Sequence, residues 1–243
     1  MTSSILFLIL AAGIPYYFIL EKLGFVSSKL IFIISALLLV GAIVLSFYMP
    51  NEHYMPFVYI SFASALFTIY KATKTTNFYR LGYYLIFVNA PFFILFEEKG
   101  AMYSSALLVS LLGLFLIARF YEKHYASANY HYIRGIMLST PHIGTYLTVY
   151  LVALALYPPL PNAFYFLSYV LSSETSAVGY VIVVTLFFGN FYLAMQVMKE
   201  SVFGKPNSNI HYVELDAKEK VMHMIVVIAL LALSINGVKE ILS

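Results

Sequence analysis

The chain contains no cysteine and few charged residues, and each shortage excludes a class of function. Without cysteine it forms no disulfide, thiolate metal site or iron–sulfur cluster, and it carries no cysteine nucleophile. Charged residues make up 10% of its 243 residues, whereas soluble domains carry about 25%. Its basic residues are scattered through short loops and form no basic stripe, so we expect no nucleic-acid partner. No basic region precedes the first apolar run, so we expect no cleaved signal peptide.

The sequence is rich in long apolar segments. Hydrophobic residues make up 62% of the chain, and segments of about 20 apolar residues, enough for a spanning helix, recur to its end. We therefore predict an all-α integral membrane protein, a single transmembrane helical domain over 1–243 in contact with the lipid bilayer. About eight spans are expected, over the approximate ranges 4–20, 28–48, 55–72, 79–96, 101–119, 140–172, 177–198 and 221–242.

Lysine and arginine alternate in number from one expected loop to the next. From the segment 21–29 to the C-terminal end they number 2, 0, 3, 1, 3, 0, 4 and 1. Loops rich in these residues face the cytoplasm, so both termini are expected outside, in a multi-pass protein of the cell inner (cytoplasmic) membrane. The alternation holds only if 140–172 is a single, broken span.

The sixth expected span carries a proline cluster in its middle. The stretch ALYPPLPNAFYFL contains Pro158, Pro159 and Pro161, followed by Asn162. Proline removes a backbone donor and clashes with the preceding helical turn, so a helix break is predicted here. A non-helical backbone at this depth must be shielded by neighbouring helices or by a small wet cavity.

Ionisable side chains inside a membrane mark transport paths, and the expected spans have almost none near their middles. Four residues near span ends are weak transport candidates, although snorkelling or loop positions explain each of them: Lys71, Lys74, Arg80 and His142. The histidines provide no paired axial ligands for haem and no cluster with metal-ligand spacing. We expect no catalytic residue, no cofactor and no metal site.

Two smaller patterns predict helix packing and helix capping. Ala106, Ser110 and Gly113 form a stripe of small residues, which more often marks close helix contact than catalysis. Asp216 precedes the last apolar run and is a candidate N-terminal cap for it.

The order of motifs in the second half of the chain points to a known family. Thr140-Pro141 opens a long helix, which breaks at Tyr157-Pro158-Pro159-Leu160-Pro161-Asn162, and VFGKPNSNIHYVELDAKEK (202–220) leads into one last helix. In this order, 70–243 resembles the C-terminal part of the antiporter-like subunits of respiratory complex I, Mrp-type cation/proton antiporters and membrane-bound hydrogenases. The first two expected spans, 4–20 and 28–48, match by hydropathy alone.

The resemblance also implies residues that this chain lacks. It implies a lysine or glutamate just after the helix break and a histidine and a lysine on the helix matching 101–119. The corresponding positions fall near Phe166 and near Ala101 and Ser105, none of which is charged. We therefore expect the helix break to be present as a structural feature, without the proton-transferring residues that the resemblance implies beside it.

Three functions remain open at this point. The first is an accessory, structural membrane subunit of a complex I-like, hydrogenase, Mrp-like or inorganic-carbon uptake assembly. Such a subunit has other integral membrane subunits as partners and no catalytic activity by itself. The second is a stand-alone transporter that moves protons, cations or a small solute through the broken sixth helix. The third, a membrane enzyme or haem protein, is disfavoured by the lack of convergent polar residues.

Overall fold

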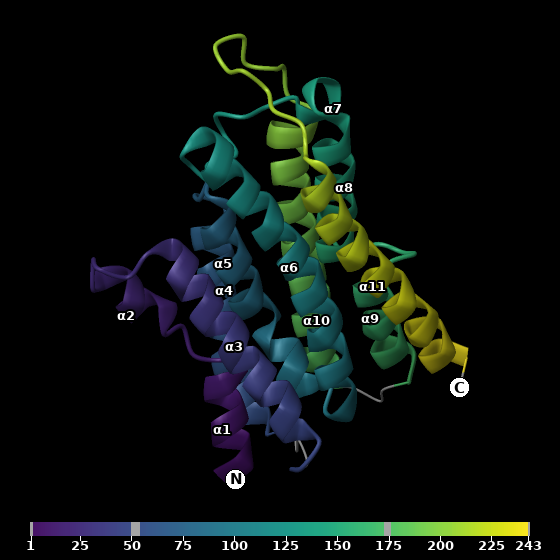
Figure 1. Cartoon of the computed structure of the whole chain (residues 1–243). Helices are drawn as coiled ribbons and strands as arrows, with labels where there is room; N and C mark the ends of the chain where they lie inside the picture. Colours follow the sequence, from purple (N-terminus) through teal and green to yellow (C-terminus); the bar gives the residue numbers. More distant parts are fainter. Residues whose placement is uncertain (1, 50–53, 173–175, 243) are drawn as a thin grey trace.

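The chain forms a bundle of helices, as expected from its composition. The computed structural model describes residues 2–49, 54–172 and 176–242, and within these ranges no strand forms beyond one isolated bridge between Asn77 and Asn129. The helices are α1 (Thr2–Leu10), α2 (Tyr17–Lys22), α3 (Ser28–Ser46), α4 (Met55–Ala72), α5 (Phe78–Leu95), α6 (Glu98–Tyr125), α7 (Ile136–Ser139), α8 (Pro141–Leu154), α9 (Pro161–Ser172), α10 (Ala177–Val197), the π-helix η1 (Met198–Val202) and α11 (Ala217–Leu242) (Figure 1).

Six of the described helices are long and apolar enough to cross a membrane. These spans are Ser28–Ser46, Met55–Ala72, Phe78–Leu95, Lys99–Tyr125, Ala177–Val202 and Ala217–Leu242. The two other expected spans, 4–20 and 140–172, are each divided into two shorter helices. The chain is therefore a multi-pass, all-helical membrane protein, and its unbroken spans are fewer than expected.

The first expected span is not one continuous helix, and that prediction is wrong. α1 ends at Leu10, Ala12 takes a positive φ of 62°, and α2 starts only at Tyr17. The physical reason is Pro15, which has no amide hydrogen and disfavours a helical conformation at the residue before it. With nine residues, α1 rises about 14 Å, roughly half of the ~30 Å hydrocarbon core.

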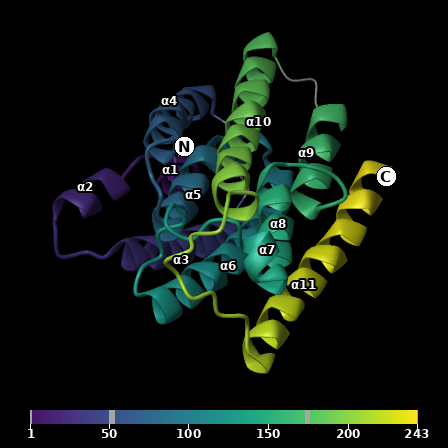
Figure 2. The same cartoon turned by 90° about the horizontal axis from the view of Figure 1, so that it is seen from above.

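Helix α5 lies at the centre of the bundle and packs against α3, α4, α6 and α10 (Figure 2). All of its residues except Arg80 are buried. Helices nearer the outside of the bundle, by contrast, present large apolar side chains outward, including Leu37 of α3, Phe188 of α10 and Ile228 of α11. An outer surface of this kind is suited to contact with lipid rather than water.

The stripe of small residues on α6 makes the close helix contacts that were predicted. Ala106 and Ser110 are fully buried, and α6 packs against α8 and α9. At Gly113 an added Cβ would overlap the ring of Tyr150 on α8. A larger residue at this position would require the Tyr150 ring to move.

Asp216 caps α11, as predicted. Its Oδ1 accepts a hydrogen bond from the Glu219 backbone N–H (2.7 Å), and Glu219 Oε2 accepts one from the Asp216 N–H (3.2 Å). This reciprocal pair is a capping box, which satisfies two of the unpaired amides at the start of the helix.

Candidate functional site

The predicted helix break lies between α8 and α9. At the end of α8, Leu156 takes a positive φ of 58°, its N–H bonds to the Ala153 carbonyl, and the Tyr157 N–H bonds to the Val152 carbonyl. These two bonds form a Schellman motif, which closes a helix C-terminus. Pro161 then occupies the first position of α9, where its missing N–H costs nothing. The sequence thus supplies both a stop and a start signal.

The break lies about half-way along the bundle (Figure 1). α8 has 14 residues and α9 has 12, so about 21 Å and 18 Å of helix separate the break from the two ends. Counted together as one crossing, α8 and α9 place this connection without regular structure deep inside a ~30 Å hydrocarbon core.

The middle of the break is exposed on the side of the molecule, contrary to the expected shielding by neighbouring helices. Tyr157 is 59% exposed, and Pro158 and Pro159 are also exposed, whereas Leu156 and Leu160 on either side are buried. Neither proline has an N–H, and neither proline carbonyl accepts a hydrogen bond from the residues that the structure describes. The stretch therefore presents hydrogen-bond acceptors to its surroundings.

Asn162, the last of the four break candidates, points the other way and is fully buried. Its Oδ1 accepts a long hydrogen bond from Ser110 Oγ on α6 (3.4 Å), while its Nδ2 has no hydrogen-bond partner among the described residues. Leaving a buried amide group unsatisfied costs about 1–3 kcal/mol. Asn162 is thus an under-satisfied polar group at the start of α9.

Phe166, which follows Asn162 by one turn of α9, belongs to a cluster of aromatic rings. Its ring lies 5.6 Å from that of Phe92, 6.4 Å from that of Phe96 and 5.5 Å from that of Phe187. The side chain is buried. The position near which the family resemblance implies a charge is therefore built into the apolar core.

A second polar cluster inside the bundle was missed by the sequence reasoning. Asn89 of α5 and Asn190 of α10 exchange hydrogen bonds, with Nδ2–Oδ1 distances of 2.9 and 3.0 Å, and the Tyr103 hydroxyl donates to Asn89 Oδ1 (2.5 Å). All three side chains are buried. Each asparagine lies within a strongly apolar stretch of its helix, and this was the available signal, because such residues often hydrogen-bond across helices in membranes.

The four weak transport candidates lie near helix ends and do not converge on the break. Lys71, near the end of α4, forms an ion pair with Glu21 of α2 (3.2 Å). Arg80, at the start of α5, donates from Nε to Ser28 Oγ (3.2 Å). Lys74 and His142 are exposed, and Lys74 lies 5.7 Å from the centre of the Tyr70 ring. Their roles in transport stay predictions.

Glu21 is the centre of a polar cluster that the sequence reasoning did not single out. Its Oε1 accepts hydrogen bonds from the hydroxyls of Tyr83 and Tyr84 (2.6 Å each), and its Oε2 accepts one from Lys71 (3.2 Å). Burial by itself raises the pKa of the carboxyl, but these hydrogen bonds outweigh it and hold the pKa below its usual range. The cluster fixes α2 against α4 and α5.

Lys99 binds the end of α9 and was also missed as a structural residue. Its Nζ donates to Ser168 Oγ (3.0 Å), to the Ser168 carbonyl (3.4 Å) and to Ser172 Oγ (2.8 Å). A positive charge at a helix C-terminus is favoured by the helix dipole. Lys99 thus ties the start of α6 to the lower half of the broken span.

His223 of α11 is a packed side chain. Its Nδ1 lies 2.9 Å from the Tyr150 hydroxyl, and its ring stacks on that of Tyr146 at 4.9 Å. No group of three or more His, Asp or Glu residues in the described ranges could hold a metal ion. The arrangement offers packing and hydrogen bonding at these positions.

Comparison with known proteins identifies the fold. No protein-family model and no curated protein matches the sequence. Among solved structures, a chain of respiratory complex I from Thermus thermophilus with bound NADH is similar, with a TM-score of 0.65 and 17% sequence identity over 76% of this chain. The match covers 44% of that other chain, so this protein spans less than half of the structure that it resembles. The likeness is one of fold.

Proposed function

We propose that this chain is an accessory membrane subunit of a redox-linked or ion-translocating complex, built beside other integral membrane subunits and without catalytic activity by itself. The fold likeness to a chain of respiratory complex I supports this proposal. So does the motif order of 70–243, which resembles the C-terminal part of antiporter-like subunits.

The exposed break at Tyr157, Pro158 and Pro159 is the observation that carries the proposal. In hydrocarbon an unsatisfied backbone carbonyl costs several kcal/mol, so lipid-exposed irregular backbone does not occur there. These three residues are exposed about half-way along the bundle, which is the middle of the membrane if α8 and α9 form one crossing. A second membrane protein that covers them, and that offers a hydrogen-bond donor to the proline carbonyls, removes the penalty.

An accessory role fits the distribution of charge better than transport by this chain alone. The charged side chains that the structure describes lie toward helix ends or in loops, and the buried polar side chains around the helix break and between α5 and α10 are amides and hydroxyls, among them Asn162, Ser110, Asn89 and Asn190. The buried His223 lies near the start of α11, away from both groups. Amides and hydroxyls do not titrate in the physiological range, so they form no side-chain proton relay.

We infer the orientation from the loop charges, and the course of the chain supports it. The start of α1 and the end of α11 lie at the same end of the bundle, opposite the loops 126–135 and 203–216 (Figure 1). If the two broken segments each count as one crossing, the chain crosses eight times in all. The basic loops then face the cytoplasm and both termini face outward across the inner membrane.

Purification of the tagged protein in mild detergent, followed by native mass spectrometry, tests the proposal. We expect a mass above that of one chain, with other integral membrane subunits bound. Replacement of the exposed ring, Tyr157→Ala, should weaken that association, whereas Tyr48→Ala, which removes an exposed ring two residues after α3, should leave it intact. A wild-type protein that is monomeric and free of partners in a detergent that preserves membrane complexes contradicts the proposal.

A further inference from the structure

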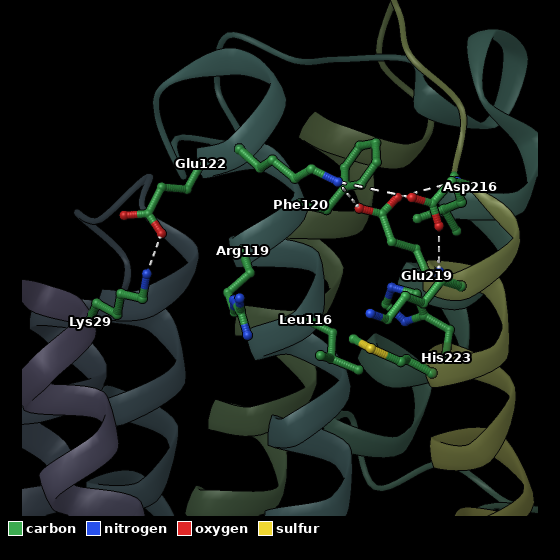
Figure 3. Close-up of a pocket in the computed structure, with 12 residues that line it drawn as sticks. Lys29, Leu116, Arg119, Phe120, Glu122, Asp216, Glu219 and His223 are labelled. Carbon is green, nitrogen blue, oxygen red and sulfur yellow. Dashed lines mark hydrogen bonds and ion pairs between the residues drawn. The ribbon is translucent and has the colours of Figure 1, made fainter.

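A hollow with charged walls lies at the end of the bundle opposite the termini. It has a volume of about 530 Å³ and lies among the start of α3, the end of α6 and the start of α11 (Figure 3). Its walls carry four basic side chains, Lys29, Arg119, Lys123 and Lys218, and three acidic ones, Glu122, Asp216 and Glu219. The proposed function does not involve this hollow.

The acidic side chains of the hollow are already engaged. Glu122 accepts from Lys29 Nζ (2.7 Å) and from the Tyr79 hydroxyl (2.8 Å). Glu219 accepts from Lys123 Nζ (2.7 Å), and Asp216 caps α11 and lies 4.0 Å from the same ammonium group. The carboxylates of the hollow are thus committed to partners on neighbouring helices.

Two of the basic side chains are not engaged in this way. Neither Arg119 nor Lys218 donates a hydrogen bond to any residue that the structure describes. Figure 3 shows the Arg119 guanidinium turned away from Glu122 and lying along α6. The hollow therefore keeps an excess of positive charge and an arginine whose fork of donors suits a phosphate group.

An apolar groove lies between the same two helices, α3 and α6, further along the outside of the bundle. Its volume is about 300 Å³, and it is lined by Phe32, Ile33, Ala36, Leu37 and Val40 of α3 and by Leu108, Leu111, Leu112 and Phe115 of α6. Phe32 follows Lys29 by one helical turn, and Phe115 precedes Arg119 by one turn, so the same two helices line the groove and the basic end. Charge at one end and an apolar channel at the other match the two parts of a phospholipid.

We propose that the hollow and the groove together bind one anionic glycerophospholipid. Its phosphate group lies on Arg119, with Lys218 as the second cation, and one acyl chain lies between α3 and α6. Basic pockets between transmembrane helices on the cytoplasmic side bind such headgroups. The net positive charge of the hollow favours an anionic lipid over a zwitterionic one, because the latter brings its own cation.

Lipid titration of the purified full chain, followed by native mass spectrometry and thermal unfolding, tests this site. Phosphatidylglycerol should bind and raise the unfolding temperature more than phosphatidylcholine of the same acyl chains. Arg119→Gln should weaken phosphatidylglycerol binding about tenfold, the loss of one strong charged contact. Lys74→Gln, which removes an exposed cation at the same end of the bundle, should leave binding unchanged.

A second substitution tests the groove separately, so that misfolding of one variant does not decide the outcome. Val40 is an exposed groove residue, and Val40→Phe should obstruct the acyl chain and weaken binding without any change in charge. Equal binding of both lipids, or phosphatidylglycerol binding that is unchanged in Arg119→Gln and in Val40→Phe, overturns the proposal. Stabilisation by inorganic phosphate alone that matches the effect of phosphatidylglycerol also overturns it, because the site then recognises an anion and not a lipid.

Discussion

Replacement of Asn190 by leucine should destabilise the protein through one identifiable contact. The side chain exchanges two hydrogen bonds with Asn89 across α5 and α10, at 2.9 and 3.0 Å. Hydrogen bonds between membrane helices contribute about 0.6 kcal/mol each on average and up to about 1.7, so Asn190→Leu should cost about 1–3 kcal/mol. Asn89→Leu removes the same two bonds and the one from Tyr103, and it should cost about 2–4 kcal/mol.

A double-mutant cycle in mixed micelles, with unfolding followed by circular dichroism, isolates the asparagine pair. The double variant should be about as unstable as Asn89→Leu alone, because both substitutions remove the same two bonds. Thr185→Val is a matched control on α10, since that exposed hydroxyl bonds only within its own helix, and it should change stability by less than about 0.5 kcal/mol. If the two single costs simply add in the double variant, the asparagine pair does not join the helices.

Two further predictions concern helix contact and pH. Gly113→Ala should cost about 1–3 kcal/mol because its Cβ overlaps the ring of Tyr150. Gly41→Ala on α3, where nothing lies within 4 Å of an added Cβ, should be neutral or stabilising by up to about 1 kcal/mol; equal effects in thermal unfolding would count against the close contact. For Glu21, the lowered pKa means that its stabilisation is present above the unfolded value of about 4.3 and is lost as pH falls through the folded pKa. Wild type should therefore be more stable than Glu21→Gln at pH 7, with the difference vanishing in acid; a difference independent of pH refutes this role.

Hydropathy predicted the unbroken helices well, because a bilayer dictates both their length and their internal hydrogen bonding. The expected span 55–72 coincides with α4, and 177–198 differs from α10 by one residue. The same averaging hid the break in the first segment, since Pro15 lies within an otherwise apolar run. A hydropathy window does not register the loss of one backbone donor.

The candidate site was predicted in part. The prolines located the break at 158–161, because their effect on a helix is local. That Tyr157 is exposed while Asn162 is buried depends on which helices pack around the break, and no local rule contains this information. Asn89 and Asn190 lie far apart in the sequence, so their pairing likewise emerges only from the fold.

Proton flux through the purified chain in liposomes tests the central claim most directly. With a pH gradient imposed and a fluorescent pH indicator inside, we predict the same leak rate as in protein-free vesicles, because a relay needs a series of titratable groups and the side chains beside the helix break are amides, hydroxyls and aromatic rings. The buried His223 lies near the start of α11 and hydrogen-bonds Tyr150. A flux well above that leak, and abolished by Asn162→Ala at the helix break, would show that this chain conducts protons alone and would contradict an accessory role.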